Sequence, residues 1–157
     1  MSKTRVVGVV VAAGLSLAGC ASVSQTRSDR AAVASAAAEA PVKVVYHFTQ
    51  GVDEAGRGLG NIRNHLAADP QARIVVVGNG PGIDFMLAGA TDKNGAPFDA
   101  AISELKARGV EFRLCRNTIT SRKIDPSTIN PEVSVIPSGV AEAARLQFRE
   151  GYSYLRP

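Results

Sequence analysis

The chain has 157 residues, with 18 lysines and arginines against 14 aspartates and glutamates, two cysteines and no tryptophan. This length suits one ordinary domain, and 45% hydrophobic with 20% charged residues is typical of a globular protein. Two cysteines far apart in the sequence exclude a disulfide-rich scaffold and a cysteine-based zinc site. The formal charge of +4 and the pI near 9.4 suggest nucleic-acid binding, but the positions of the charges along the chain weaken this interpretation.

The first residues have the features of an export signal. Lys3 and Arg5 give a positive start, residues 6–17 form an apolar run, and small residues precede Cys20. The run is too short to cross about 30 Å of hydrocarbon comfortably as a helix. Removing Lys3 and Arg5 leaves 18 − 2 = 16 basic residues against 14 acidic ones. With so small an excess, we expect no nucleic-acid partner.

The sequence Leu-Ala-Gly-Cys ending at Cys20 resembles the lipobox of bacterial lipoproteins. The resemblance implies that residues 1–19 are a signal peptide and that Cys20 becomes an acylated N-terminus, carrying chains such as palmitate that anchor the protein in a membrane. In lipoproteins, a residue other than aspartate directly after the cysteine is typical of export to the outer membrane. Ala21 occupies this position, so the resemblance implies an outer-membrane anchor with the domain facing the periplasm. The alternative is an ordinary signal peptide with an incidental cysteine.

Residues 20–41 have a different composition from the rest of the chain. Alanine, serine and valine dominate, aromatic residues are absent, and Pro41 ends the stretch. Such a segment has almost nothing to bury, so we interpret it as a flexible tether between the lipidated N-terminus and the domain.

From residue 42 to 157, strand patterns alternate with helix patterns. Strands are expected at residues 42–48, 74–77, 110–115 and 133–136, with a short edge strand at 152–155. Helical spacing appears at residues 59–66, 98–105 and 140–148. Such alternation favours parallel pairing through right-handed crossovers. The predicted fold class is α/β: a three-layer α/β/α domain with a mainly parallel sheet of four to five strands.

The helix ends are marked by glycine or proline. Gly109 follows the second helix, and Gly151 follows the last one. The last helix is indicated by the apolar spacing of Val140, Ala143, Ala144 and Phe148. In an open parallel sheet, reactive groups gather beyond the carboxyl ends of the strands. The segments at those ends are residues 49–51, 78–82, 115–118 and 137–139.

A glycine-rich loop follows the second strand, with Gly78, Asn79, Gly80 and Gly82. Exposed amides there could hold an anion or a sulfur group at a helix start. The alternative is a tight turn that needs a positive φ. Neither a dinucleotide fingerprint nor a phosphate-binding P-loop occurs, so no cofactor is expected.

Cys115 is the candidate reactive residue. It ends the third strand between Arg113 and Arg116, and Asn117 and Thr118 are suited to start a helix. Positive charge and helix-terminal amides both stabilise a thiolate, so we expect a lowered pKa. The alternative is a small buried residue with no reactivity.

The two histidines do not make a site by themselves. His47 lies inside the first strand and His65 inside the first helix, without the spacing of a metal site. A cysteine–histidine pair with Cys115 requires that His47 reach the carboxyl end of its strand. No metal is expected.

Three stretches resemble the DsrE/DsrF-like family: residues 109–118 (GVEFRLCRNT), residues 137–142 (PSGVAE) and residues 150–157 (EGYSYLRP). The resemblance covers about residues 42–157. It implies a small α/β domain that assembles as a homo-oligomer and, in several members, acts in a sulfur relay. The sulfur-accepting cysteine of the family maps onto Cys115, which would carry sulfane sulfur as a persulfide.

Two functions remain open from the sequence. The first is a membrane-anchored periplasmic protein that accepts or transfers sulfur through Cys115, supported by Arg113, Arg116, Asn117 and Thr118. The second is a non-catalytic envelope binding or oligomerisation module with an inert cysteine. Relay members are cytoplasmic, whereas this chain carries an export signal, so the sulfur donor and the sulfur acceptor are not identified.

Overall fold

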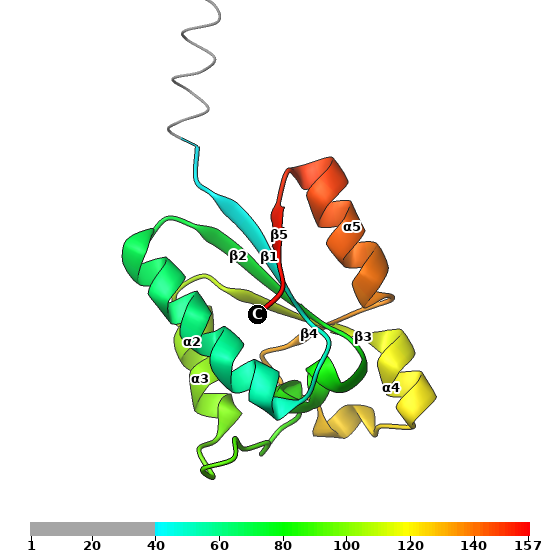
Figure 1. Ribbon diagram of the computed structural model, residues 1–157. Coiled ribbons are helices and arrows are strands. Elements are labelled where there is room, and N and C mark those ends of the chain that lie inside the picture. Colours follow the sequence, from blue (N-terminus) through cyan, green and yellow to red (C-terminus); the bar gives the residue numbers. More distant parts are fainter. Residues whose placement is uncertain (1–39) are drawn as a thin grey trace, which may run out of the picture. The chain divides into compact units, whose positions relative to one another are not determined.

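A five-stranded parallel sheet forms the middle layer of the structure, a computed structural model that describes residues 40–157 (Figure 1). The strand order is β4-β3-β2-β1-β5, and all neighbours are parallel. The strands are β1 (Lys43–Phe48), β2 (Arg73–Gly78), β3 (Glu111–Cys115), β4 (Ser134–Ile136) and β5 (Ser153–Leu155). β1 and β2 are almost wholly buried, as their valine-rich sequences predict. The α/β prediction and the short edge strand are confirmed.

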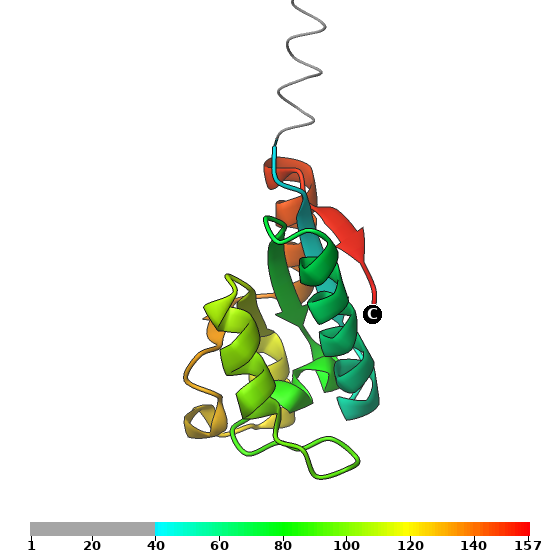
Figure 2. The same ribbon diagram turned by 90° about the vertical axis from the view of Figure 1, so that its left-hand side faces the viewer.

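Helices cover both faces of the sheet. The helical elements are α2 (Val52–Ala68), the 3-10 helix η1 (Gly80–Met86), α3 (Phe98–Ala107), α4 (Arg116–Arg122), the 3-10 turn η2 (Pro126–Thr128) and α5 (Gly139–Glu150). Figures 1 and 2 place α2 and α3 on one face and α5 on the other. The domain therefore has the three predicted layers.

The described residues begin after the predicted signal and most of the tether. Residues 1–19, Cys20 and the tether up to residue 39 lie outside them, and the domain from Pro41 to Pro157 is described by itself. Within residues 40–157, no helix is long and apolar enough to cross a membrane.

The two faces of the sheet differ in what they bury. The face toward α2 and α3 holds the larger core, in which the Phe48 and Phe85 ring centroids lie 5.1 Å apart. The face toward α5 has a smaller apolar cluster that includes Leu146. Because side chains alternate along β3, Leu114 enters the large core while Cys115 faces α5. Strand periodicity thus sets the direction of the candidate thiol.

Glycines end two helices as predicted, and a carboxylate fixes the start of another. φ is +88° at Gly109 and +73° at Gly151, in the left-handed region that favours glycine. At the start of α2, the buried Glu54 carboxylate accepts hydrogen bonds from the N–H groups of Thr49 and Gln50, at 2.8 and 2.6 Å. This carboxylate closes the turn between β1 and α2.

The buried face of α5 differs from the apolar spacing that marked this helix. Val140 is 60% exposed and Phe148 is 89% exposed, whereas Ala143 and Leu146 are buried. Only Ala143 belongs to both sets, because the sheet meets the side of the helix that carries small and aliphatic residues. The larger apolar side chains face outward and cover no part of this domain's core.

Two glycines of α2 predict opposite effects of added side-chain volume. A Cβ at Gly58 would lie 2.5 Å from the Phe48 ring and 2.7 Å from the Pro157 Cβ, whereas nothing lies within 4 Å of a Cβ at Gly60. We expect Gly58→Ala to lower the free energy of unfolding by about 1–3 kcal/mol through overpacking. Gly60→Ala should raise it by about 1 kcal/mol through helix propensity. Urea denaturation measures both, and equal midpoints for the two variants would contradict the packing.

Candidate functional site

Three of the four segments expected at the carboxyl edge of the sheet meet around Cys115. Cys115 ends β3 and is the N-cap residue of α4, and it is only 5% exposed. A Cβ built on Gly139, the first residue of α5, would lie 3.3 Å from the Cys115 Cβ and 3.0 Å from the Asn79 Cβ. The start of α5 therefore packs directly between the thiol and the loop after β2.

Hydrogen bonds rather than charges favour the thiolate of Cys115. Burial raises the pKa of the thiol, but hydrogen bonds from the backbone N–H groups of Gly139, Thr118 and Asn117 and from the Thr118 side chain outweigh burial. The pKa of Cys115 therefore lies below its ordinary value. Amides at the starts of two helices point at one sulfur atom, an arrangement that stabilises negative charge on it.

Thr118 links the thiol to the glycine-rich loop. Its side chain is buried, and its Oγ1 accepts a hydrogen bond from the Gly80 N–H at 2.9 Å. A hydroxyl can accept and donate at the same time, and the Thr118 hydroxyl hydrogen donates toward the Cys115 sulfur. Sequence reasoning proposed Thr118 for its backbone position, and the structure adds a hydroxyl contact that connects two loops.

The glycine-rich loop is a tight turn whose amides are used within the chain. The Asn79 N–H donates to the Phe48 carbonyl and the Gly82 N–H to the Asn79 carbonyl, both at 3.1 Å, and the Gly80 N–H is taken by Thr118. φ at Gly80 is +56°, and a Cβ at Gly82 would lie 2.2 Å from the Phe48 carbonyl oxygen. This geometry favours the turn over an open anion cradle. The Gly78 position is also crowded, because a Cβ there would lie 2.8 Å from the Gly82 carbonyl oxygen.

The two flanking arginines occupy different environments. Arg113 is half-buried and forms ion pairs with Glu142 on α5 and, at 2.7 Å, with Glu111 on its own strand. Arg116 is exposed at the first residue of α4. Two carboxylates neutralise the Arg113 charge, so its contact supports the docking of α5 rather than the thiolate. Sequence reasoning missed Glu142, because no local pattern pairs residues on a strand and a distant helix.

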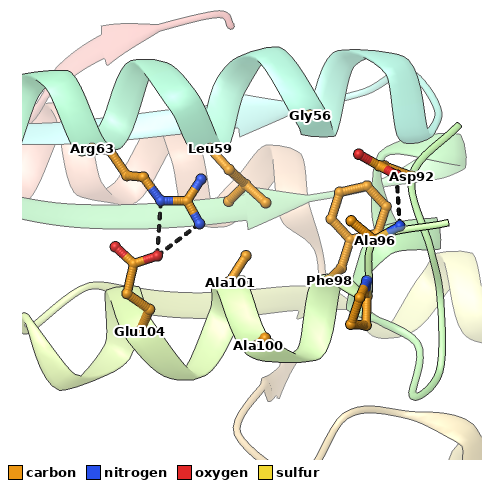
Figure 3. A pocket seen from close by; sticks show the side chains of 10 residues that line it. Gly56, Leu59, Arg63, Asp92, Ala96, Phe98, Ala100, Ala101 and Glu104 are labelled. Carbon is orange, nitrogen blue, oxygen red and sulfur yellow. Dashed lines mark hydrogen bonds and ion pairs between the residues drawn. The ribbon is translucent and has the colours of Figure 1, made fainter. Parts of the chain in front are cut away.

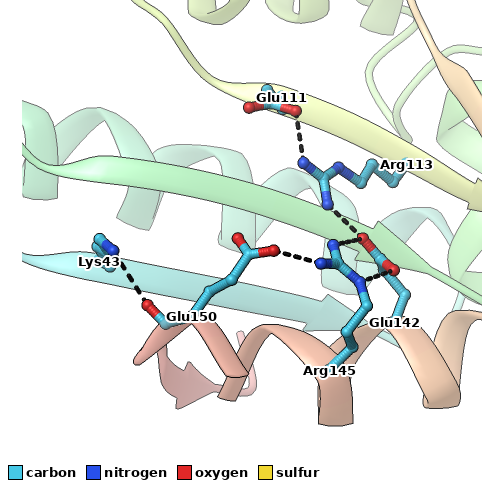
Figure 4. Close-up of polar contacts among 6 residues, drawn as sticks. All are labelled: Lys43, Glu111, Arg113, Glu142, Arg145 and Glu150. Atoms are coloured by element: carbon cyan, nitrogen blue, oxygen red, sulfur yellow. Dashed lines mark hydrogen bonds and ion pairs between the residues drawn. The ribbon is translucent and has the colours of Figure 1, made fainter. Parts of the chain in front are cut away.

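A network of charged side chains extends from Arg113 along α5 (Figure 4). Arg145 bonds Glu142 at 2.7 Å and also pairs with Glu150, while the Lys43 Nζ donates to the Glu150 carbonyl at 3.0 Å. The Arg145 guanidinium, with help from Arg113, holds the pKa of the Glu142 carboxyl below its ordinary value, although burial acts in the opposite direction and raises it. The network ties α5 to β3 and β1.

The histidines lie on opposite faces of the sheet. His47 Nε2 lies 2.8 Å from Asn79 Oδ1, so this residue contacts the loop after β2. His65 Nδ1 lies 3.0 Å from the hydroxyl of Tyr46, on the side of α2. Among residues 40–157, no group of three or more histidine, cysteine, aspartate or glutamate side chains could hold a metal ion.

A hollow of about 330 Å³ lies between α2, α3 and the loop that joins η1 to α3 (Figure 3). Arg63 pairs with Glu104 across it at 2.7 Å, and Asp92 accepts the Ala96 N–H at 2.8 Å. None of the residues that contact Cys115 lines this hollow. It is a separate surface feature on the far side of the sheet.

Comparisons with known proteins identify the fold and a family. The sequence profile of the DsrE/DsrF-like family matches residues 29–157. A protein of unknown function, MTH1491 from Methanobacterium thermoautotrophicum, is similar with 29% identity and a TM-score of 0.65, covering 74% of this chain and 99% of that one. The ychN protein from E. coli shares the fold with 16% identity and a TM-score of 0.57, covering 74% and 98%. No curated protein matches the chain.

The Thr118 hydroxyl provides a test of the thiolate environment. In Thr118→Val the Cys115 thiolate loses a donor, so its pKa should rise and alkylation by iodoacetamide at pH 7 should slow about tenfold, the effect of one hydrogen bond to a charged group. Thr118→Ser keeps the hydroxyl and should retain the native rate. Thr120→Val, at an exposed position of the same helix, is the matched control. Equal rates in Thr118→Val and Thr120→Val would show that the hydroxyl does not act on the thiol.

Proposed function

The chain belongs to the DsrE/DsrF-like family, and we propose that it acts in a sulfur relay by carrying sulfane sulfur as a persulfide on Cys115. The observation that carries the proposal is the lowered pKa of Cys115, which arises from hydrogen bonds from Gly139, Thr118 and Asn117. A thiolate is the form of cysteine that attacks sulfur.

The transfer proceeds by two thiol–disulfide-type exchanges. The Cys115 thiolate attacks the outer sulfur of a donor persulfide, forming a new S–S bond while the donor S–S bond breaks and the donor leaves as a thiolate. An acceptor thiolate then attacks the outer sulfur on Cys115, which restores the Cys115 thiolate. Neither step needs an oxidant or a reductant, because the sulfane sulfur moves without net redox change. The N–H groups around Cys115 stabilise the negative charge before the first step and after the second.

The proposal places this chemistry at a membrane surface. The lipobox-like sequence before Cys20 supports acylation, export and a periplasm-facing anchor in the outer membrane. The donor and acceptor would then be envelope thiols or persulfides. The family resemblance also supports a homo-oligomer, for which Val140 and Phe148 on α5 offer exposed apolar surface. Sedimentation velocity of the delipidated protein tests this assembly, and a single-protomer mass would contradict it.

An inert envelope module is the second candidate. The observation that favours it is the 5% exposure of Cys115, which restricts the approach of a bulky partner. In that case the hydrogen bonds around the sulfur serve the packing of α5, and the outward face of the helix is the functional surface.

Loading with polysulfide separates the two functions. The mature protein should gain the mass of one or more sulfur atoms in intact mass spectrometry, and a thiol acceptor should remove this mass. Cys115→Ser should gain none, whereas Cys20→Ser should gain the same mass as the wild type. Absence of the adduct on wild-type Cys115 would favour the inert module.

The membrane anchor is tested by labelling cells with radioactive palmitate. The wild-type protein and Cys115→Ala should incorporate the label, and Cys20→Ala should lose it together with its membrane fraction, because acyl chains anchor the mature N-terminus. If the label persisted in Cys20→Ala, the proposed acylation of Cys20 would be contradicted.

A further inference from the structure

Two side chains of α4 hold the glycine-rich loop on both sides of Gly80. The Gly80 N–H donates to Thr118 Oγ1 at 2.9 Å, and the Gly80 carbonyl accepts a hydrogen bond from Arg122 Nη1 at 3.1 Å. Thr118 and Arg122 are four residues apart, so they lie on the same face of the helix. Both polar backbone groups of Gly80 are therefore bonded to α4.

Asp84 fixes the position of the arginine. Arg122 Nη1 lies 2.6 Å from Asp84 Oδ1, so one nitrogen of the guanidinium bonds both this carboxylate and the Gly80 carbonyl. Asp84 and Gly80 belong to the same 3-10 helix, η1. The neighbours of Asp84, Ile83 and Phe85, are buried in the large core. The ion pair therefore joins the end of α4 to a part of the chain that the core holds in place.

The short helix α4 depends on contacts of this kind. It has seven residues, which is too few for a helix that is stable by itself. Its buried residues are Thr118 and Ile119, and it ends at Lys123, where φ is +55°. The orientation of α4 is thus set by the packing of Ile119 and by the bonds at Thr118 and Arg122. Because the Thr118 hydroxyl donates toward the Cys115 sulfur, a rotation of α4 would weaken that bond.

We propose that Arg122, held by Asp84, is a positioning residue that fixes the Thr118 hydroxyl against the sulfur of Cys115. The donors to the sulfur lie at the starts of α4 and α5, whereas Arg122 is the last residue of α4. Arg122 therefore acts through Thr118. The inference deepens the proposed function and rests on it for the persulfide, in which the same hydroxyl would donate to the sulfur bonded to Cys115.

The test measures the pH profile of iodoacetamide alkylation of Cys115 in the mature protein free of bound sulfur. Arg122→Met removes both hydrogen bonds and should slow alkylation about threefold at a pH below the wild-type midpoint, moving the profile to higher pH. The effect is smaller than that of Thr118→Val, because the hydroxyl is retained and only its position is relaxed. An Arg122→Met profile that matches the wild type would overturn the proposal.

Asp84→Ala separates positioning from charge. Loss of a negative charge near a thiol would by itself lower the pKa of the thiol and speed alkylation. Loss of the anchor for Arg122 should instead raise the pKa of Cys115 and slow alkylation about twofold. Faster or unchanged alkylation in Asp84→Ala would overturn the role of this carboxylate.

A double variant tests whether Arg122 acts through the hydroxyl. Arg122→Met should cause no further slowing when Thr118→Val has already removed the hydroxyl, because the two changes interrupt the same chain of contacts. Slowing by the same factor in both backgrounds would show that the arginine acts on the thiol by another route and would overturn the positioning role. If Arg122→Met does not fold, Asp84→Ala alone and combined with Thr118→Val decides the matter.

The Arg63–Glu104 pair supplies the matched control (Figure 3). Its nitrogen-to-oxygen distance is 2.7 Å and its side chains are 39% and 46% exposed, against 40% and 31% for Arg122 and Asp84. It joins α2 to α3 on the far side of the sheet. Arg63→Met and Glu104→Ala should leave the alkylation profile unchanged, and equal shifts in these variants would attribute the effect to general destabilisation and overturn the proposal.

The outcomes distinguish this inference from the proposed function, because polysulfide plays no part in the alkylation measurement. A wild-type protein that takes up no sulfur while the Arg122 and Asp84 variants shift the thiol profile would contradict the sulfur relay and support the positioning role. Sulfur uptake by the wild type together with unshifted profiles in both variants would overturn the positioning role and leave the relay supported.

Discussion

The close approach of α5 to the end of β3 is the constraint on which the site depends. A Cβ at Gly139 would lie 3.0 Å from the Asn79 Cβ and 3.3 Å from the Cys115 Cβ, so any side chain there would push these neighbours apart by a few tenths of an ångström. This approach brings the Gly139 N–H to the thiol and adds the dipole of a twelve-residue helix to that of the short α4. A helix displaced by the width of one methyl group would leave Cys115 as a buried thiol without its principal donor.

Ion pairs act together with a small apolar contact in holding α5 in that position. The buried cluster under α5 is small, whereas the core under α2 and α3 is extensive. Arg113 and Glu142 are 17% and 13% exposed, so their pair is less screened by solvent than an ordinary surface salt bridge. Arg113, two residues before Cys115, therefore contributes to the site indirectly, because it helps to fix the helix whose N–H group contacts the sulfur.

The sequence allowed the elements, their order and the position of Cys115 to be predicted, because these follow from local patterns. The valine runs of β1 and β2, the alternation in β3 and the glycines after α3 and α5 each act within a few residues. The role of Arg113 could not be predicted, because its partner Glu142 becomes a neighbour only through the crossover from β4 to α5. The same limit applies to His47, whose contact with Asn79 depends on strand order.

The orientation of α5 shows why apolar spacing alone misidentified its buried face. Val140 and Phe148 fit a helical stripe, yet the sheet requires small side chains where the helix begins against Cys115 and Asn79. Gly139, Ala143 and Leu146 satisfy that requirement, and the bulkier stripe is rotated outward. The buried face of this helix is thus chosen by the close contact at its first residue, and the same contact that lowers the pKa of the thiol leaves an apolar surface exposed on the opposite side.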